Sequence, residues 1–206
     1  MAWNAEAWTG DLLSGRRTEL RVIAGTARSL PLKTVRGNNT RPTTDRIKET
    51  LFNMISAEVP GCRFLDLFAG SGAIGIEALS RGAQCAAFVE QDRNALQVIR
   101  QNLNFTHLTE NARVIAGDVI RTVTSMDGEK SFGVIFMDPP YDNELEKRVL
   151  EVLRHNTIAD SDTLIIIEAS NDTDFSYLDE YGYTMIKDKH YGSNRHVFVR
   201  KGTIND

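Results

Sequence analysis

The amino-acid sequence predicts an α/β fold: a doubly wound, mostly parallel sheet of seven strands that ends in an antiparallel C-terminal hairpin. Its 206 residues suit one main domain with a sizeable core. From residue 63 onward, short apolar segments alternate with amphipathic ones, as strands alternate with helical crossovers in such sheets. Two of the apolar segments, Val134–Met137 and Leu164–Ile167, are uninterrupted, which is typical of strands covered on both faces.

The N-terminal part precedes this alternation and is expected to form a small extension of a β-hairpin and a helix. Two β-prone segments, 20–24 and 30–35, flank Gly25-Thr26 and predict the hairpin. A helix is expected over about 44–57, because its apolar residues recur at helical spacing. Those residues are Ile47, Leu51, Met54 and Ile55. The remaining stretch, 1–20, shows no hydrophobic period and is expected to form an arm.

The main domain, expected at 59–206 after the basic hairpin and helix at 21–58, supplies the sheet. Strands are predicted at 63–67, 85–90, 112–116, 132–137, 163–168, 183–189 and 196–200. Helices are predicted at 72–82, 92–104, 118–126, 143–156 and 174–180. The last two strands are joined by Tyr191–Asn194 with no helix between them, which predicts the antiparallel hairpin at the sheet edge.

Charge is distributed unevenly along the chain, whose net charge is −4. Nine Arg and Lys residues lie between Arg16 and Lys48, opposed by Glu19 and Asp45 alone, so this segment carries +7 and the remainder −11. A basic segment on an acidic body can contact phosphates while the rest of the surface repels them. The candidate nucleic-acid contacts are Arg28, Lys33, Arg36 and Arg46. A solvated basic loop is the alternative.

Other classes of function find little support. The N-terminal residues lack a secretory signal, and no segment approaches the ~20 apolar residues of a membrane span. The four histidines show no metal-ligand spacing with one another or with the two cysteines. We therefore expect a cytoplasmic protein, without a membrane association and without a metal.

A glycine-rich turn after the strand at 63–67 is the first candidate site. Glycine allows a close approach of the backbone to a ligand, and the amides at a helix start face it. Gly70, Gly72 and Gly75 alone also fit a tight turn or a dinucleotide fingerprint. Two acids favour a nucleoside: Glu90 could accept hydrogen bonds from ribose hydroxyls, and Asp118 from an adenine amine, although Asp118 is also a good helix N-cap.

The choice between a dinucleotide and S-adenosylmethionine depends on Asp66, which lies inside the strand before the turn. A carboxylate there would repel a pyrophosphate, but it could orient the loop or meet a cationic amino group. Asp66 thus favours S-adenosylmethionine as the cofactor, and the second motif, described next, favours it more. The expected cofactor residues of the turn and the strand ends are Asp66, Phe68, Ala69, Gly70, Ser71, Gly72, Glu90, Gln91, Asp118 and Val119.

A second motif, Asp138-Pro139-Pro140-Tyr141, follows another apolar strand. Two prolines withhold two N–H donors, so a backbone carbonyl is free to face a ligand. An exocyclic amine on a base is a poor nucleophile, and two acceptors on its hydrogens favour the form whose lone pair can attack a methyl group. Asp138 could also take the released proton. Tyr141 offers an aromatic face for a flipped base.

These motifs resemble the class I S-adenosylmethionine-dependent methyltransferases, and more narrowly the bacterial 16S ribosomal RNA guanine-N2 methyltransferase family that modifies guanine 966. The resemblance runs from about Arg21 to Lys201. It rests on the segments Arg21–Arg28, Arg41–Asn53, Leu65–Gly82 and Met137–Tyr141. It implies a Rossmann-like methyltransferase fold, and it places Arg41, Thr43 and Thr44 at the methionine end of the cofactor. The implied catalytic residues are Asp138, Pro139, Pro140 and Tyr141.

The implied substrate is 16S ribosomal RNA, as naked RNA, in the small subunit or in an assembly intermediate, and the protein is expected to act as a monomer. Three alternatives differ in class. A DNA base amino-methyltransferase shares the Asp-Pro-Pro-Tyr chemistry but usually carries a target-recognition region for which this chain has no room. A protein-glutamine methyltransferase usually begins that loop with Asn. A non-catalytic RNA-binding ribosome-assembly module would not need the acids at the cofactor positions.

Overall fold

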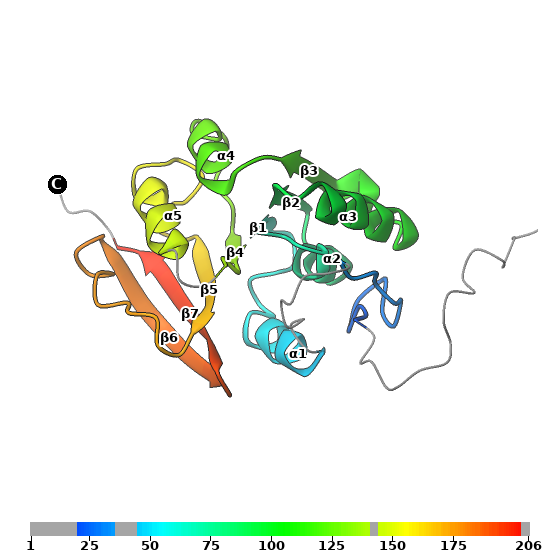
Figure 1. Cartoon of the computed structure of the whole chain (residues 1–206), viewed down its shortest axis with the longest axis horizontal. Coiled ribbons are helices and arrows are strands. Elements are labelled where there is room, and N and C mark those ends of the chain that lie inside the picture. The colour runs from blue at the N-terminus through cyan, green and yellow to red at the C-terminus, as the bar shows by residue number, and fades with distance from the viewer. Residues whose placement is uncertain (1–19, 36–44, 141–143, 203–206) are drawn as a thin grey trace, which may run out of the picture.

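A seven-stranded mixed sheet forms the centre of the molecule (Figure 1). The computed structural model describes residues 20–35, 45–140 and 144–202, and every structural statement concerns these residues. The strands are β1 Arg63–Leu67, β2 Cys85–Glu90, β3 Ala112–Ala116, β4 Val134–Met137, β5 Leu164–Ser170, β6 Tyr183–Tyr191 and β7 Asn194–Lys201. Their order across the sheet is β3-β2-β1-β4-β5-β7-β6.

The strand pairing confirms the expected doubly wound sheet with an antiparallel C-terminal hairpin. β1 to β5 pair in parallel, whereas β7 is antiparallel to both β5 and β6. The chain moves outward from β1 to β3 and then returns to place β4 on the other side of β1. Loops leave this reversal point in opposite directions, and ligands of open α/β sheets bind there.

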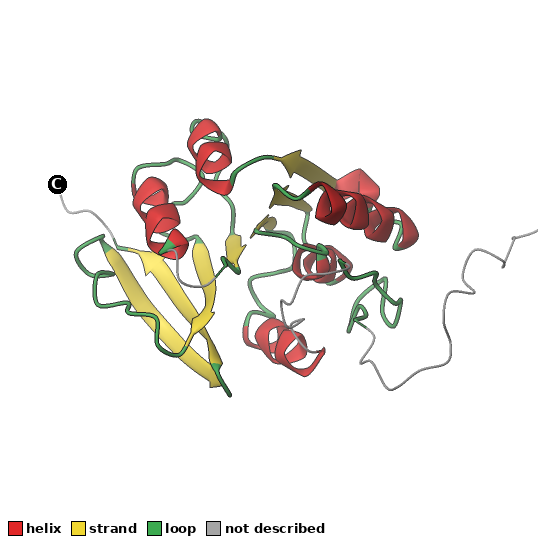
Figure 2. Ribbon diagram, viewed as in Figure 1, coloured by secondary structure: helices red, strands yellow, loops and turns green. Residues whose placement is uncertain are grey.

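Five helices cover the two faces of the sheet in the described part of the chain (Figure 2). They are α1 Asp45–Met54, α2 Ala73–Ser80, α3 Arg93–Phe105, α4 Val119–Ser125 and α5 Leu145–Arg154. Helices α1, α2 and α3 pack on one face and α4 and α5 on the other, each with its own apolar cluster. None of the described helices has the length and apolar character needed to cross a bilayer.

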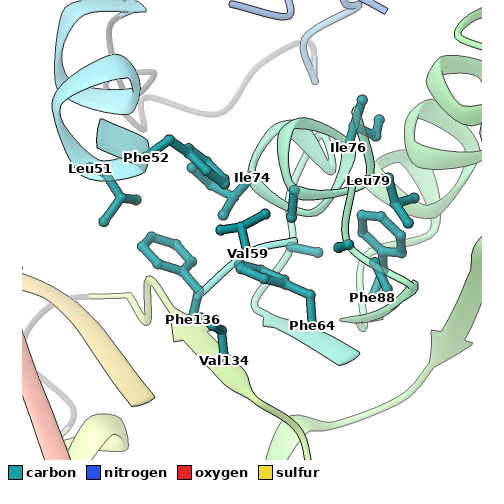
Figure 3. Close-up of a cluster of buried hydrophobic side chains, with 14 of the residues drawn as sticks. Leu51, Phe52, Val59, Phe64, Ile74, Ile76, Leu79, Phe88, Val134 and Phe136 are labelled. Carbon is teal, nitrogen blue, oxygen red and sulfur yellow. The ribbon is translucent and has the colours of Figure 1, made fainter. Parts of the chain in front are cut away.

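The first of these clusters contains most of the aromatic core (Figure 3). Phe52 of α1 lies over Phe64 of β1, with ring centroids 6.4 Å apart. Helix α2 can approach the sheet because Gly75 has no side chain: a Cβ there would lie 2.3 Å from a ring carbon of Phe88. Gly75 of the glycine-rich motif therefore serves helix packing, and only the earlier glycines remain for a ligand.

The N-terminal hairpin is shorter than expected. Pairing between 20–24 and 30–35 reduces to one antiparallel bridge, Arg21 with Pro31, with a few flanking backbone hydrogen bonds. Pro31 has no N–H to donate, and the amides of Ile23 and Ala24 donate to the Glu77 carboxylate instead of to a partner strand. The segment is therefore held by α2 as well as by its own backbone hydrogen bonds.

The helix predicted at 174–180 is wrong, because the structure has turns there. The carboxylate of Asp174 accepts hydrogen bonds from both the amide and the hydroxyl of Ser176. Such local bonds of Asp and Ser compete with helix formation. The segment still buries Phe175 and Leu178 against the second core cluster.

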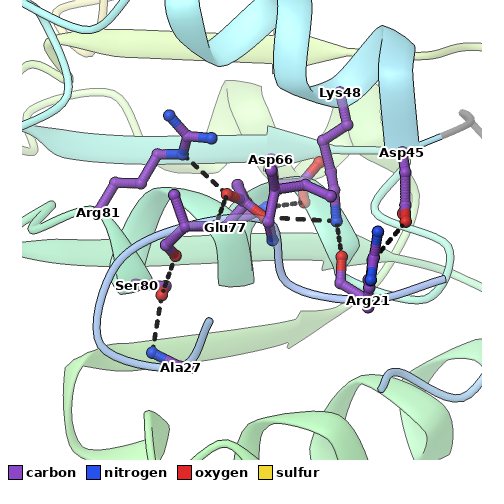
Figure 4. Close-up of polar contacts among 11 residues, drawn as sticks. Arg21, Ala27, Asp45, Lys48, Asp66, Glu77, Ser80 and Arg81 are labelled. Carbon is purple, nitrogen blue, oxygen red and sulfur yellow. Dashed lines mark hydrogen bonds and ion pairs between the residues drawn. The ribbon is translucent and has the colours of Figure 1, made fainter. Parts of the chain in front are cut away.

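Glu77 is the centre of a buried polar network that joins α1, α2 and the N-terminal segment (Figure 4). Its carboxylate accepts from the amides of Ile23 and Ala24 at 2.8 and 3.0 Å and from the guanidinium of Arg81 at 2.7 Å. The ammonium of Lys48 lies 3.4 Å from the same carboxylate and donates to the carbonyl of Arg21. Both Glu77 and Lys48 are fully buried.

Lys48 therefore has a structural role and is not part of a basic surface, although it belongs to the basic segment of the sequence. Burial lowers the pKa of its ammonium, and the Glu77 carboxylate opposes that shift. A second anchor lies one turn along α2, where the Ser80 hydroxyl donates to Ala24 and accepts from Ala27. Gly25 passes so close that a Cβ would lie 1.8 Å from the Ser80 carbonyl oxygen.

We expect Glu77→Gln to destabilise the protein by about 3–5 kcal/mol, because it leaves the Lys48 ammonium buried without its counter-charge. Urea denaturation of the variant measures this loss. Glu49→Gln, on an exposed position of α1, is the matched control and should change the free energy of unfolding little. A loss below about 1 kcal/mol would show that the network contributes no more than a surface ion pair.

Candidate cofactor and reaction site

The loop from Phe68 to Gly72 leaves the carboxyl end of β1 at the reversal point of the sheet. Three of its residues have positive φ: Phe68 at 60°, Gly70 at 55° and Gly72 at 76°. Glycine adopts this region at no steric cost, but an aromatic side chain does not. The strain at Phe68 marks the loop as a segment whose shape the surrounding structure imposes, as is frequent at ligand sites.

Asp66 fixes the start of α2, which directly follows this loop. Its carboxyl is buried, and Oδ2 accepts a hydrogen bond of 2.9 Å from the amide of Gly75. Burial raises the pKa of Asp66 to about 8, and the charge of Glu90 contributes to the rise. The carboxyl is thus largely protonated near neutral pH, which suits the orientation of the loop and the start of α2 better than the binding of a cationic group.

Glu90 connects the end of β2 to the same loop. One carboxylate oxygen accepts from the amide of Gly70 at 2.8 Å, and the other accepts from the amides of Gln91 and Asp92 at 2.8 and 2.9 Å. A carboxylate has about four lone-pair directions. Capacity for a hydroxyl therefore remains after these three bonds.

Asp118 caps the start of α4, which is one of the two roles expected for it from the sequence. Its Oδ1 accepts from the amide of Arg121 at 3.0 Å, at the start of α4. The amide of Gly117 donates to the carbonyl of Glu90, which ties this cap to the end of β2. Of the other predicted cofactor residues, Gln91 is exposed, Phe68 and Ser71 are half-buried, and Ala69 and Val119 are buried.

These residues fit a nucleoside. A Cβ at Gly70 would meet one atom, the carbonyl oxygen of Phe68 at 4.0 Å, so the loop leaves open space on that side. Acceptors for hydroxyl and amino groups lie at the ends of β2 and β3, in Glu90 and Asp118. Arg41, Thr43 and Thr44, which the resemblance assigned to the methionine end, lie outside the described residues.

The proline motif begins directly after β4. Asp138 is half-buried, Pro139 is buried and Pro140 is exposed, while Tyr141 lies outside the described residues. Burial raises the pKa of Asp138 well above its ordinary value, and the charges of Glu168 and Asp66 raise it further. The motif therefore lies beside two other acids that come from neighbouring strands.

Glu168 and His196 are site residues that the sequence interpretation missed. Glu168 is 5% exposed near the carboxyl end of β5, and its carboxylate lies 3.2 Å from Nε2 of His196 on β7. The side-chain amide of Asn194 donates to the other carboxylate oxygen at 3.3 Å. The sequence could have indicated Glu168, because this acid follows an apolar strand segment just as Glu90 does.

A cavity of about 490 Å³ adjoins the proline motif. Pro139 and Pro140 form one wall, and Glu146, Lys147 and Tyr177 line the others. Its volume lies within the ~300–1,000 Å³ usual for small-molecule sites. A nucleobase turned out of its stack could be accommodated beside the motif.

The candidate nucleic-acid residues are only partly described. Arg28, Lys33 and Arg46 are exposed, and Arg36 lies outside the described residues. Lys33 is fixed through its backbone: Asn102 of α3 accepts from its amide and donates to its carbonyl. The same Asn102 donates to the carbonyl of Ser71, so it links this basic segment to the glycine-rich loop.

Comparisons with known proteins converge on one group. Residues 20–200 match the family described as Conserved hypothetical protein 95. The chain is 33% identical over 175 residues to Ribosomal RNA small subunit methyltransferase D from Haemophilus influenzae, which covers 84% of this chain and 90% of that relative. It is 43% identical over 150 residues to YlbH from Bacillus subtilis, covering 72% and 82% of the two chains.

A comparison with solved structures also finds a relative of similar fold. The Escherichia coli protein yhhF is 31% identical and superposes with a TM-score of 0.76, over 89% of this chain and 98% of that chain.

We expect Asp66→Asn to flatten the pH dependence of stability. The folded pKa of Asp66, about 8, exceeds its unfolded value, so the stability from this group is complete below the unfolded pKa and is lost as pH rises through about 8. The loss approaches about 1.4 kcal/mol per pH unit between the two values. Urea denaturation between about pH 5 and pH 8 tests this, with the exposed Asp179→Asn as control. Parallel curves for wild type and Asp66→Asn would contradict the raised pKa.

Proposed function

Because the chain belongs to the family described as Conserved hypothetical protein 95, we propose that it is a ribosomal RNA methyltransferase acting on the exocyclic N2 amine of a guanine in 16S ribosomal RNA. The methyl donor would be S-adenosylmethionine. Relatives named Ribosomal RNA small subunit methyltransferase D, at 33% and 35% identity, support the substrate. Guanine 966 is the position that the family resemblance implies.

One observation carries the proposal: the glycine-rich loop and the proline motif leave adjacent strands at the same edge of the sheet. β1 and β4 pair in parallel with Leu67 beside Met137, so Phe68 and Asp138 begin their loops side by side. A cofactor over the first loop and a base against the second would therefore meet. Neither motif alone specifies group transfer to an amine.

S-adenosylmethionine, when bound, supplies an electrophilic methyl group on a sulfonium. The chain would hold its ribose through Glu90 and its adenine near Asp118, Val119 and Gln91, while Phe68 to Gly72 bring backbone close to it. Glu90 already fixes the amide of Gly70, so the acceptor and the loop are placed together. This arrangement avoids reorganisation when the cofactor binds.

Asp138 and a backbone carbonyl of the proline motif would accept hydrogen bonds from the two N2 hydrogens of guanine. A protonated carboxyl still has a carbonyl oxygen that accepts, so the raised pKa of Asp138 is compatible with this contact. The two acceptors would orient the nitrogen lone pair toward the methyl group. The cavity beside Pro139 and Pro140 would hold the base, with Tyr141 as a stacking partner.

The RNA-binding surface would lie along the N-terminal segment, with Arg28, Lys33, Arg36 and Arg46 as phosphate contacts. The network around Glu77 holds this segment on α2, at the start of which the cofactor loop lies. An acidic body with one basic segment favours a target that is partly coated by protein, namely a small-subunit assembly intermediate rather than naked RNA. We propose that the protein acts on it as a monomer.

Transfer of radiolabelled methyl groups to small-subunit particles that lack this modification tests the function. We expect the label in N2-methylguanosine, and we expect Asp138→Ala to abolish transfer while cofactor affinity stays near that of wild type. Label in DNA or in protein controls would keep the cofactor site and overturn the substrate. Bound cofactor without transfer to any target would favour a non-catalytic RNA-binding module.

We expect Arg28→Glu with Lys33→Glu to weaken RNA binding and to reduce its salt dependence, by about 0.7 in the slope of log K against log salt for each lost phosphate contact. Arg148→Glu reverses an exposed charge on α5, which packs on the opposite face of the sheet, and serves as the control. Filter binding over a salt series gives the slopes. A double variant with the wild-type slope would mean that the segment is a solvated loop.

A further inference from the structure

On one face of the sheet, Asp138, Glu168 and His196 lie in one row where β4 ends beside β5 and β7, and Asp66 of β1 lies two residues before the level of that row. The strand order is β1-β4-β5-β7, and register pairs Asp66 with Phe136, Phe136 with Ile166, and Glu168 with His196. Phe64, Phe136, Ile166 and Phe198 share one core cluster. Because side chains alternate along a strand, residues two positions away lie on that same face: Asp66, Asp138, Glu168 and His196.

Within this row, Asp138 and Glu168 are neighbours. Met137 pairs with Ile167, so each acid is the next residue of its strand. No other role in the proposed reaction uses Glu168, yet it is a buried acid beside the reacting group. Burying such a group costs free energy unless it is held by partners.

Two polar side chains of β7 hold the Glu168 carboxyl. The Nε2 atom of His196 lies 3.2 Å from one carboxylate oxygen, and the side-chain Nδ2 atom of Asn194 lies 3.3 Å from the other. The Nδ1 atom of His196 is buried without a hydrogen-bond partner among the described residues. A second ring proton would be an unpaired buried donor there, so the geometry favours a neutral ring that donates through Nε2.

Tyr191 lies beside this pair of side chains and does not ionise near neutral pH. Tyr191 packs against the His196 ring, with centroids 5.0 Å apart. Burial, and next the charge of Glu168, raise the pKa of Tyr191 to about 12, so this phenol stays neutral near neutral pH. Asp138 and Glu168 are adjacent carboxyl groups, and after burial the charge of Glu168 is the next cause that raises the pKa of Asp138.

We propose that Glu168 is a positioning residue that receives, through Asp138, the proton released by the guanine amine. This inference rests on the proposed function. The N2 lone pair forms the N–C bond with the methyl group, and the C–S bond breaks with its electron pair on sulfur. The N2 proton passes to the carbonyl oxygen of Asp138, whose own hydroxyl proton passes to Glu168. Asp138 ends as it began, and Glu168 neutralises as the sulfonium charge disappears.

Carboxyl ¹³C NMR of the ligand-free protein tests the pair without any activity. In wild type, we expect the signals of Asp138 and Glu168 to titrate together in two separated steps. In Glu168→Gln, Asp138 should titrate in one step, at lower pH than the upper step of wild type. Glu110→Gln, an exposed control, should keep the wild-type curves. An unchanged Asp138 titration in Glu168→Gln would overturn the proposal.

Single-turnover kinetics test the proton relay, that is, the proposed transfer of the proton through Asp138 to Glu168. Glu168→Gln should lower methyl transfer at saturating RNA by about 10–100-fold, with cofactor affinity and KM for RNA within about twofold of wild type. Glu168→Asp keeps the charge and should recover part of the rate; it also replaces the Gln variant if that chain does not fold. A loss that appears in KM alone, or no loss at all, would overturn the proposal.

Failure of the proposed function gives a different result. If wild-type protein methylates no RNA, the substrate assignment falls, whereas the carboxyl titrations still decide whether Asp138 and Glu168 share a proton. If wild type methylates RNA and the two carboxyls titrate independently, the function stands and the relay is refuted.

Discussion

The Glu77 carboxylate is the constraint on which the arrangement of the molecule depends. It accepts two backbone amides of the N-terminal segment and pairs with Lys48 of α1 and Arg81 of its own helix, all at a fully buried position. A buried polar network whose donors and acceptors are all hydrogen-bonded makes the surrounding structure rigid and favours one arrangement of its segments. The start of α2 also carries the cofactor loop, so the same contacts align that loop with the basic segment.

The sheet could be predicted from the sequence because its order follows from general rules. Uninterrupted apolar strands, alternating helices and right-handed crossovers leave few topologies, and the glycine and proline motifs mark the reversal point. The hairpin and the helix at 174–180 were harder, since each depends on competition for backbone amides: Glu77 takes those of Ile23 and Ala24, and Asp174 takes that of Ser176. Neither of these competing hydrogen bonds can be predicted from the secondary-structure propensity of the local sequence.

The site was predictable to the extent that its residues lie at strand ends. Glu90, Asp118 and Asp138 were proposed in that way, and Glu168 could have been; Asp66 was proposed from its place inside β1, just before the glycine-rich turn. The part that His196 plays was not accessible, because its approach to Glu168 requires the antiparallel placement of β7. Lys48 shows another limit of sequence analysis. It was counted with the basic segment that could contact phosphates, whereas the fold buries it completely.

The position of β7 has a consequence for how the chain is made. This strand follows β6 in the sequence, yet it lies inside the sheet, between β5 and β6. During translation, the edge of β5 that faces β7 stays unpaired until residues 194–200 have left the ribosomal tunnel, and unpaired edges promote association between chains. A chain that stops before Asn194 would lack His196 and expose that edge, so premature termination would yield an aggregating product rather than a partly active one.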